Sequence, residues 1–242
     1  MASPPFRFKK FSVDQAGAAH PLGTDSVLLG AWADVSGCHS VLDIGTGTGV
    51  VALMLAQRLL ERAKEPGIRV VGVEIHSPSA ACARRNFEAS PWREHLEVET
   101  ISIRDFARSS ALRFDLIVSN PPFFSEKTFS PDALRRLGRS AAALSQEDLL
   151  SAAIALLNPG GRLCVILPAR EGRRLCEMAV PAGLYCTQET AVRTRPHKPV
   201  ERLLLRFERN PYPFQRKELV VYAEGSMYTA EFQKLTGVFY LQ

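Results

Sequence analysis

The chain has 242 residues, a hydrophobic content of 46% and a net charge of +5 at pH 7. This length and composition fit an α/β domain with a sizeable core, and no stretch approaches the roughly 20 apolar residues of a membrane-spanning helix. The first residues lack the apolar core of a signal peptide, so we expect a cytoplasmic protein that does not bind membranes. The five cysteines form no C-x-x-C pair, so we expect neither a metal site nor a disulfide framework.

Two segments precede the first long apolar run. Phe6 to Phe11 is rich in aromatic residues, and Gly23-Thr24-Asp25 comes directly before an apolar segment over 26–32. We expect a helix over 26–32, and the side chain of Thr24 or Asp25 could cap its first backbone N–H groups.

Residues 40–209 alternate between strand and helix patterns, which is typical of a wound, mostly parallel α/β sheet. Strands are expected over 41–44, 70–74, 96–101, 116–119 and 162–168. Helices are expected over 50–62, 78–89, 146–157 and 170–180. Ser145 and Asp148 occupy capping-box positions before the third of these helices. The segments 185–195 and 202–208 alternate like an antiparallel edge hairpin, so we predict one domain with a core over 40–209 and extensions over 1–39 and 210–242.

A glycine-rich turn follows the first predicted strand. It reads Asp43-Ile44-Gly45-Thr46-Gly47-Thr48-Gly49, and glycines at alternate positions allow positive φ angles and close approach of a ligand. Its spacing differs from the G-x-G-x-x-G fingerprint of dinucleotide sites, and the acidic Asp43 disfavours an anion. We therefore expect a cationic ligand or one with hydroxyl and amine groups. Glu74 ends the second strand, where an acid in dinucleotide folds accepts hydrogen bonds from ribose.

The tetrapeptide Asn120-Pro121-Pro122-Phe123 follows the apolar run over 114–119. Two prolines remove two backbone donors and fix two φ angles, so the Asn120 amide and the neighbouring carbonyls become rigidly held acceptors. With an aromatic ring beside them, these acceptors suit a planar substrate that carries an –NH2 group. The alternative is a strand that simply ends in a proline turn.

Basic residues gather in two segments that follow predicted strands. They are Lys127, Arg135, Arg136 and Arg139 in the first segment, and Arg193, Arg195, His197, Lys198 and Arg202 in the second. If both segments lie at the carboxyl ends of the strands, they flank the crevice where ligands bind and suit the phosphates of a nucleic acid. The alternative is ordinary solvated loop charge. The stretch over 124–143 is long and charged, and we expect it to be mobile.

The chain resembles the Rossmann-like, S-adenosylmethionine-dependent methyltransferases through four elements, namely Asp43 to Gly49, Glu74, Asp105 and Asn120 to Phe123. The resemblance implies a seven-stranded, mostly parallel sheet with helices on both faces and an antiparallel edge hairpin. It implies S-adenosylmethionine as the cofactor, in contact with Asp43, Gly45, Thr46, Gly47 and Gly49 below its methionine, Glu74 and Ile75 at its ribose, Asp105 and Phe106 at its adenine, and Asn120.

The N-terminal segments resemble those of the bacterial tRNA1(Val) (adenine-37-N6)-methyltransferases. That family opens with an F-x-F-K-x-F strand and a G-T-D-x-x-L-L-G-A-W helix, which match Phe6 to Phe11 and Gly23 to Trp32. The resemblance implies that Gly23, Thr24 and Asp25 lie beside the methionine end of the cofactor, and that the partner is a tRNA bound by a monomer. It adds these expected RNA contacts: Phe124, Lys127, Arg135, Arg136, Arg139, Arg195 and Lys198.

The expected mechanism needs no metal and no strong general base. The Asn120 side-chain oxygen and the Pro121 carbonyl accept hydrogen bonds from the adenine amino group, while Phe123 stacks on a base splayed out of its loop. Catalysis then consists mostly of positioning the amino nitrogen against the methyl group.

Three other functions share parts of this pattern. An rRNA guanine-N2 methyltransferase also carries N-P-P-F, whereas many adenine-N6 enzymes carry tyrosine at the position of Phe123. A protein-glutamine N5-methyltransferase usually carries N-P-P-Y and a helical N-terminal domain. A non-catalytic module that binds RNA or the cofactor has no use for Asn120. The tRNA1(Val) family also has Ala-Arg-His near the place where this chain has Gly138-Arg139-Ser140.

The C-terminal extension over 212–242 is rich in aromatic residues. We expect an extra short strand near 219–222, with the strand over 6–11 as its candidate partner, and a terminal helix over 229–235. The extension either packs on the core or helps to hold the substrate, and packing is the more common role of aromatic residues.

Overall fold

A computed structural model describes residues 4–62, 67–121 and 144–241. Its main sheet has eight strands, in the spatial order β10-β8-β9-β7-β6-β3-β4-β5. The strands are β3 (Ser40–Ile44), β4 (Arg69–Val73), β5 (Leu96–Glu99), β6 (Phe114–Ser119), β7 (Leu157–Pro168), β8 (Tyr185–Arg193), β9 (Arg202–Glu208) and β10 (Gln215–Val220). Within this sheet, β9 runs antiparallel to its neighbours β7 and β8, and every other adjacent pair is parallel.

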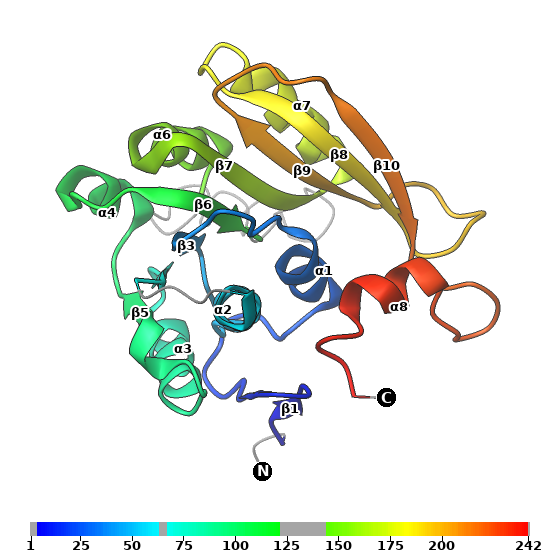
Figure 1. The fold of residues 1–242 in the computed structure, drawn as a ribbon, viewed down its shortest axis with the longest axis horizontal. Helices are drawn as coiled ribbons and strands as arrows, with labels where there is room; N and C mark the ends of the chain where they lie inside the picture. Colours follow the sequence, from blue (N-terminus) through cyan, green and yellow to red (C-terminus); the bar gives the residue numbers. More distant parts are fainter. Residues whose placement is uncertain (1–3, 63–66, 122–143, 242) are drawn as a thin grey trace, which may run out of the picture.

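Helices cover both faces of this sheet (Figure 1). One face is covered by α1 (Thr24–Trp32), α2 (Val50–Arg62) and α3 (Ser77–Glu88), and the other by α4 (Ile103–Ser109), α6 (Gln146–Leu156) and α7 (Ala169–Ala179). A 3-10 turn at Arg93–His95 precedes β5, and α8 (Ala230–Thr236) lies beside α1.

The core consists of two apolar layers, one on each face of the sheet. Successive residues of a strand point to opposite faces, so Val41 packs in the layer below α1 and α2, and Leu42 packs in the layer below α4 and α6. Strands that are buried on both faces read as continuous apolar runs, which explains why the central strands could be found in the sequence. The expected mostly parallel α/β fold with helices on both faces is confirmed.

The tail strand departs from expectation. It pairs in parallel with β8 over six residues, from Gln215 opposite Gln188 to Val220 opposite Arg193, so the sheet gains an eighth strand and the β8–β9 hairpin does not form its edge. The strand expected over 6–11 forms instead a two-residue pairing of β1 (Phe6–Arg7) with β2 (Ser12–Val13). An unpaired β8 would leave a row of free backbone groups, and β10 satisfies them.

The two extensions meet through aromatic rings and not through a shared ladder. The Phe8 ring stacks on Phe11 with centroids 4.6 Å apart and on Tyr240 with centroids 6.1 Å apart. The Lys9 backbone N–H donates to the Phe239 carbonyl at 2.8 Å. The end of the chain therefore packs against its beginning, beside α1 and α2.

Element boundaries agree closely at most predicted helices. The capping box at Ser145 and Asp148 is present, and α6 ends at Leu156. Beyond it, β7 already begins at Leu157, and the segment over 158–161 forms a bulge between the pairs Phe114–Leu157 and Leu116–Arg162. The largest difference is thus at β7, which begins five residues before the expected residue 162, and β5 ends at Glu99 instead of continuing to residue 101.

Candidate active site

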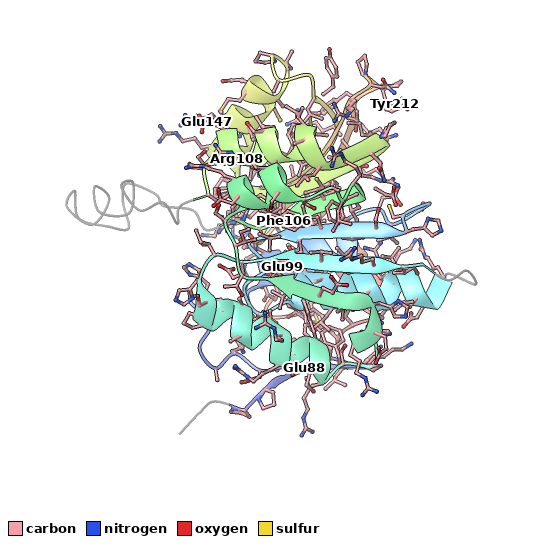
Figure 2. All side chains as sticks on the ribbon, turned by 90° about the vertical axis from the view of Figure 1, so that its left-hand side faces the viewer. Glu88, Glu99, Phe106, Arg108, Glu147 and Tyr212 are labelled. Atoms are coloured by element: carbon pink, nitrogen blue, oxygen red, sulfur yellow. The ribbon has the colours of Figure 1, made fainter. Side chains whose placement is uncertain are left out.

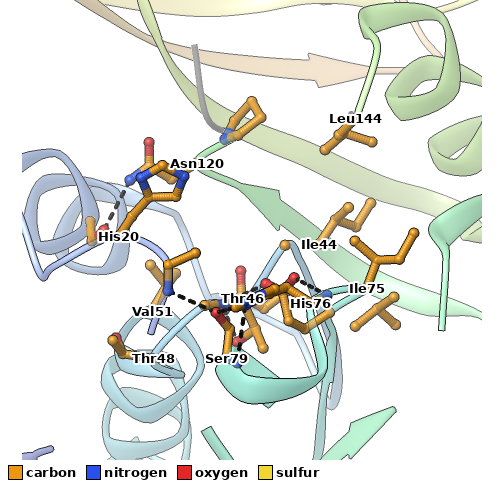
Figure 3. Close-up of a pocket in the computed structure, with 18 of the residues that line it drawn as sticks. His20, Ile44, Thr46, Thr48, Val51, Ile75, His76, Ser79, Asn120 and Leu144 are labelled. Carbon is orange, nitrogen blue, oxygen red and sulfur yellow. Dashed lines mark hydrogen bonds between the residues drawn. The ribbon is translucent and has the colours of Figure 1, made fainter. Parts of the chain in front are cut away.

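A cavity of about 750 Å³ lies at the carboxyl ends of β3, β4, β5 and β6 (Figure 3). Pockets for small molecules span roughly 300–1,000 Å³ and favour this edge of an open α/β sheet. Five segments supply most of its lining, namely residues 19–26, 43–48, 73–76, 101–104 and 120–121, and Val50, Val51, Ser79, Leu144 and Asp148 complete it.

The glycine turn after β3 forms the floor of the cavity. Gly45 and Gly47 have φ angles of 71° and 57°, which favour glycine. A Cβ atom on Gly45 would have none of the described residues within 4 Å, so they leave the backbone open to a ligand there. Gly49 is different: it does not line the cavity, and a Cβ atom on it would lie 2.4 Å from Cε1 of Phe87. Gly49, which was expected to contact the cofactor, is thus needed for packing against α3.

Asp43 is the buried acid of the site. Its side chain is almost fully enclosed and accepts a hydrogen bond from Oγ1 of Thr46 at 2.6 Å. The pKa of Asp43 is raised from 3.8 to about 7, chiefly by burial; the negative charge of Glu74 adds to the rise, and hydrogen bonds from Thr46 and the Ala52 backbone oppose it. A positively charged ligand group beside this carboxyl would stabilise its ionised form.

Glu74 is held at the end of β4 by two backbone donors. Oε2 accepts from the Gly47 N–H at 3.0 Å, and Oε1 accepts from the His76 N–H at 2.9 Å. Each carboxylate oxygen has a second lone pair, so both oxygens can still accept hydrogen bonds from ligand hydroxyls. Gly47 and Glu74 thereby join the two loops of the floor into one rigid rim.

Apolar side chains line the part of the cavity next to Glu74. Ile75 is 38% exposed although it is a large hydrophobic residue, and Ile101, Ile103 and Leu144 also line the cavity. Figure 3 shows Ile44, Ile75 and Leu144 on one side of the pocket, whereas Asn120 and His20 lie on the other. This apolar slot suits a flat ring system.

Asp105 and Phe106 do not reach this slot. Asp105 lies in the first turn of α4, where its 62% exposed side chain accepts from Oγ of Ser102 at 2.6 Å. Phe106 is buried between α4 and the sheet, with its ring 6.4 Å from that of Phe114 (Figure 2). Because β5 ends early and α4 already begins at Ile103, the chain turns before Asp105. Residues 101–104 line the cavity in place of Asp105 and Phe106, the two residues expected at the adenine.

Asn120 stands at the end of β6 with its amide oriented by α1. Its Nδ2 donates to Oγ of Ser26 at 2.9 Å, which leaves Oδ1 as an acceptor, and both Asn120 and Pro121 line the cavity. Ser119 anchors the strand end from below, since its Oγ donates to the Ile44 carbonyl at 2.9 Å. Ser26 was not among the expected site residues, because its role depends on α1 lying against β6.

The segment Gly23-Thr24-Asp25 lines the cavity at the start of α1. Gly23 is the N-cap residue, and no side chain of the described residues caps this helix, so the capping alternative for Thr24 and Asp25 is wrong. Asp25 accepts instead from Nε of Arg202 at 2.8 Å. This ion pair ties the first residue of β9 to the cavity wall.

Two parts of the wall gave no chemical signal in the sequence. The segment over 19–22 is fixed by a bond from the Ala19 N–H to Oγ of Ser79 at 3.0 Å. On the opposite side, Arg104 forms two hydrogen bonds with the carboxylate of Asp148. The segment over 19–22 could have been inferred from its position next to Gly23-Thr24-Asp25. Arg104 and Asp148 could not, because only the packing of α4 on α6 brings them together.

The remaining site predictions divide by location. Phe123, Phe124, Lys127, Arg135, Arg136 and Arg139, and the stretch expected to be mobile, lie outside the described residues. Arg195 and Lys198 lie in the loop between β8 and β9, where the Arg195 guanidinium carbon lies 5.8 Å from the centre of the Tyr222 ring.

The described residues contain no group of three or more His, Cys, Asp or Glu side chains that could hold a metal ion. Among the same residues, no helix has the length and apolar character needed to cross a membrane.

The sequence is similar to curated proteins over nearly its whole length. A family model described as the methyltransferase small domain matches residues 23–174. The tRNA1(Val) (adenine(37)-N6)-methyltransferase of Trichodesmium erythraeum is 41% identical over 237 residues, which cover 98% of each chain. The protein of the same name from Bacteroides thetaiotaomicron is 39% identical over 242 residues, which cover 100% of this chain and 99% of the relative.

Solved structures share the fold. A predicted O-methyltransferase, Atu636 of Agrobacterium tumefaciens, superposes with a TM-score of 0.64 at 22% identity and covers 89% of this chain and 96% of its own. The 16S rRNA N2 G1207 methyltransferase RsmC of T. thermophilus, solved with AdoMet and guanosine, has a TM-score of 0.54 at 24% identity over 86% of this chain and 50% of its own. The chain belongs to the methyltransferase small domain family and, within it, to the tRNA1(Val) (adenine(37)-N6)-methyltransferases.

Proposed function

We propose that this protein transfers a methyl group from S-adenosylmethionine to N6 of adenine 37 in the anticodon loop of tRNA1(Val), acting as a cytoplasmic monomer. The observation that carries the proposal is the Asn120 amide, which is oriented by Ser26 and faces the cavity beside Pro121. Asn120 and Pro121 thus place two acceptors for an amino group in the wall of a pocket whose shape and charges fit the cofactor. The relatives named for this reaction match the chain from end to end.

The residues of the cavity fit S-adenosylmethionine at both of its ends. Asp43 and the open backbone at Gly45 would hold the positively charged methionine part, with Gly23 to Asp25 beside it. Glu74 would accept from the ribose hydroxyls, and the apolar slot at Ile75 would cover the adenine. When bound, the cofactor supplies an electrophilic methyl group on a sulfonium.

The target nitrogen is a weak nucleophile, and a hydrogen bond to Asn120 would make it more reactive. The lone pair of an adenine amino group is delocalised into the ring. Hydrogen bonds from that –NH2 group to Oδ1 of Asn120 and to the Pro121 carbonyl favour a pyramidal nitrogen whose lone pair points away from the ring. Because Ser26 holds the other end of the amide, Oδ1 keeps its position without rearrangement, and such positioning accounts for much of a transfer rate.

The base must leave its loop to reach these acceptors. We propose that Phe123, which lies outside the described residues, stacks on the base. We propose that Arg195 and Lys198 in the β8–β9 loop also contact the RNA, as do Phe124, Lys127, Arg135, Arg136 and Arg139. The nitrogen loses its proton to solvent after methyl transfer, since methylation makes that proton acidic, so no strong base is required.

Labelled methyl transfer to total tRNA, rRNA and release factors, followed by nucleoside and amino-acid analysis, tests this proposal. N6-methyladenosine at position 37 of tRNA1(Val) is the expected product. N2-methylguanosine in rRNA would assign the guanine reaction instead, and methylated glutamine would exclude both RNA reactions. An absence of transfer to all three, with cofactor still bound, would indicate a binding module.

The role of Asn120 has its own variant. Asn120→Ala should still bind the cofactor and lose at least about a hundredfold in kcat. Asn210→Ala is the matched control, because Asn210 is exposed beyond the end of β9, at the opposite edge of the sheet from the cavity. Full activity of Asn120→Ala would refute the mechanism. Size-exclusion chromatography with light scattering measures the molar mass and so tests the proposed monomer.

A further inference from the structure

Four flat groups stack in a row beside the active-site edge of the sheet, and we call them the aromatic column: Phe232, Tyr228, Tyr222 and Arg195. The Phe232 and Tyr228 rings lie 4.5 Å apart at 23°, and the Tyr228 and Tyr222 rings lie 5.1 Å apart at 20°. The Arg195 guanidinium lies over the Tyr222 ring at 5.8 Å. The members come from α8, from the segment between β10 and α8, and from the β8–β9 loop.

Only one end of the column is enclosed. Phe232 is fully buried, whereas Tyr228 is 40% exposed and both Tyr222 and Arg195 are half-buried. Rings that serve only for packing are expected to be enclosed, but three of these four groups are in part accessible to solvent. The end opposite Phe232 is a guanidinium, whose planar face stacks well on aromatic rings and nucleobases.

The column lies at the same edge of the sheet as the cavity. β8 and β10 run parallel to β7, β6 and β3, because β8 and β7 are both antiparallel to β9. The carboxyl ends of β3 and β6 open into the cavity, and those of β8 and β10 lead to Arg195 and Tyr222. The loop that carries Arg195 ends at Arg202, which is bound to Asp25 in the cavity wall. Figure 1 shows this loop beside the segment that precedes α8.

Hydrogen bonds hold the loop in shape. The Tyr222 N–H donates to the Thr194 carbonyl at 2.9 Å, and Nη1 of Arg193 donates to the Lys198 carbonyl at 2.6 Å. The nearby acids are engaged elsewhere, since Glu201 accepts from Thr194 and Glu218 pairs with Arg193. Within the described part of the chain, no carboxylate pairs with Arg195 or Lys198. The loop therefore presents two cations without compensating charge.

We propose that the aromatic column is a second nucleotide subsite, which binds an unpaired nucleotide next to the one that enters the cavity. The base of that nucleotide stacks on the outer face of the Arg195 guanidinium, and Lys198 pairs with its phosphate. The proposal rests on the proposed function, because an anticodon loop whose target base is splayed out exposes the neighbouring bases for stacking. The C-terminal extension thus holds substrate in addition to packing on the core.

Steady-state methylation of tRNA tests the subsite with two variants of one residue. Arg195→Ala should raise the KM for tRNA about tenfold, as loss of one stacked base does, and leave kcat and the Kd of S-adenosylmethionine unchanged. Arg195→Lys keeps the charge but not the plane and should recover only part of this loss. Arg93→Ala is the control, because Arg93 is an exposed arginine in the turn before β5, at the opposite edge of the sheet.

A second measurement uses the unmodified enzyme and so does not depend on how a variant folds. A tRNA with 5-bromouridine beside the target adenine should photocrosslink to peptides that contain residues 193–198 or 222–228. Crosslinks that map only to other peptides would overturn the subsite.

The outcomes separate the two proposals. Wild-type KM in Arg195→Ala, with the wild-type enzyme methylating tRNA, would reduce the column to packing and leave the proposed function intact. Complete recovery by Arg195→Lys would show that charge alone acts there and would overturn the stacking. A wild-type enzyme that neither binds nor methylates RNA would overturn both.

Discussion

The buried acid Asp43 should make both stability and cofactor binding depend on pH. Its carboxyl has a pKa of about 7 in the folded protein against an ordinary 3.8, chiefly because of burial. Since a tenfold change in proton affinity corresponds to about 1.4 kcal/mol, ionised Asp43 costs the free protein about 4 kcal/mol. The folded state binds this proton more tightly than the unfolded chain, so the contribution of Asp43 to the free energy of unfolding falls as the pH rises from about 4 to 7.

Asp43→Asn removes this cost while keeping the shape of the side chain and an oxygen for the Thr46 hydroxyl. Without cofactor, the variant should be more stable than the wild type at pH 8, by an amount of up to about 4 kcal/mol, and the difference should shrink as the pH falls. Urea unfolding of both proteins between pH 5 and 8.5 measures it. Thr236→Ser, a mild change at a buried hydroxyl distant from the cavity, provides a variant whose difference from the wild type should not depend on pH.

Cofactor binding should show the opposite dependence. A positively charged ligand requires ionised Asp43, so the affinity for S-adenosylmethionine should rise with pH up to about 7 and then level off. Calorimetry in buffers of different ionisation enthalpy should detect proton release below pH 7, and Asp43→Asn should bind weakly with no such release. Parallel pH profiles of the wild type and Asp43→Asn in both experiments would refute the reasoning.

Three further outcomes follow from the site. Ser26→Ala removes the hydrogen bond that orients the Asn120 amide, so kcat should fall about tenfold or more with unchanged cofactor affinity. Ser26→Thr keeps the hydroxyl and should keep most of the activity, and an equal loss in both variants would contradict a role of this hydrogen bond. Asp105→Asn should leave the Kd of S-adenosylmethionine within about twofold of the wild type, whereas Glu74→Gln should raise it about tenfold. Equilibrium binding measures both values, and a larger effect of Asp105→Asn would contradict the prediction. Gly45→Ala strains a positive φ by about 1 kcal/mol and places a methyl group in the cavity, so both the melting temperature and cofactor affinity should fall, and an unchanged affinity would speak against a ligand at this turn.

The strands and their terminal polar residues could be predicted because each depends on a local pattern. A strand buried on both faces must be continuously apolar, and the first polar residues beyond it lie where the strand ends. Glu74 and Asn120 follow this rule, Asp43 lies one residue before the end of β3, and all three line the cavity. The helix α2 begins and ends at the predicted residues, since its apolar periodicity is regular.

Asp105 and Gly49 lie outside the cavity lining because a boundary or a contact decided their positions. Asp105 was expected at a strand end, but β5 stops two residues early and the side chain belongs to α4. Gly49 belongs to the pattern of the glycine turn, but a side chain is excluded there because the ring of Phe87 in α3 packs against it. Neither result is encoded in the spacing, because each depends on how a helix packs on the sheet.

The sequence by itself determined the apolar strands, the glycine turn with its positive φ angles and the chemistry of the N-P-P motif, because these depend on neighbours along the chain. Only the tertiary structure decided which distant residues complete the site. Ser26 lies 94 positions before Asn120, and Arg202 lies 177 positions after Asp25. The pairing of β10 with β8, which brings Tyr222 beside Arg195, also depends on tertiary packing. The backbone groups of an edge strand can pair with any segment, so packing against the core selects the one that lies there.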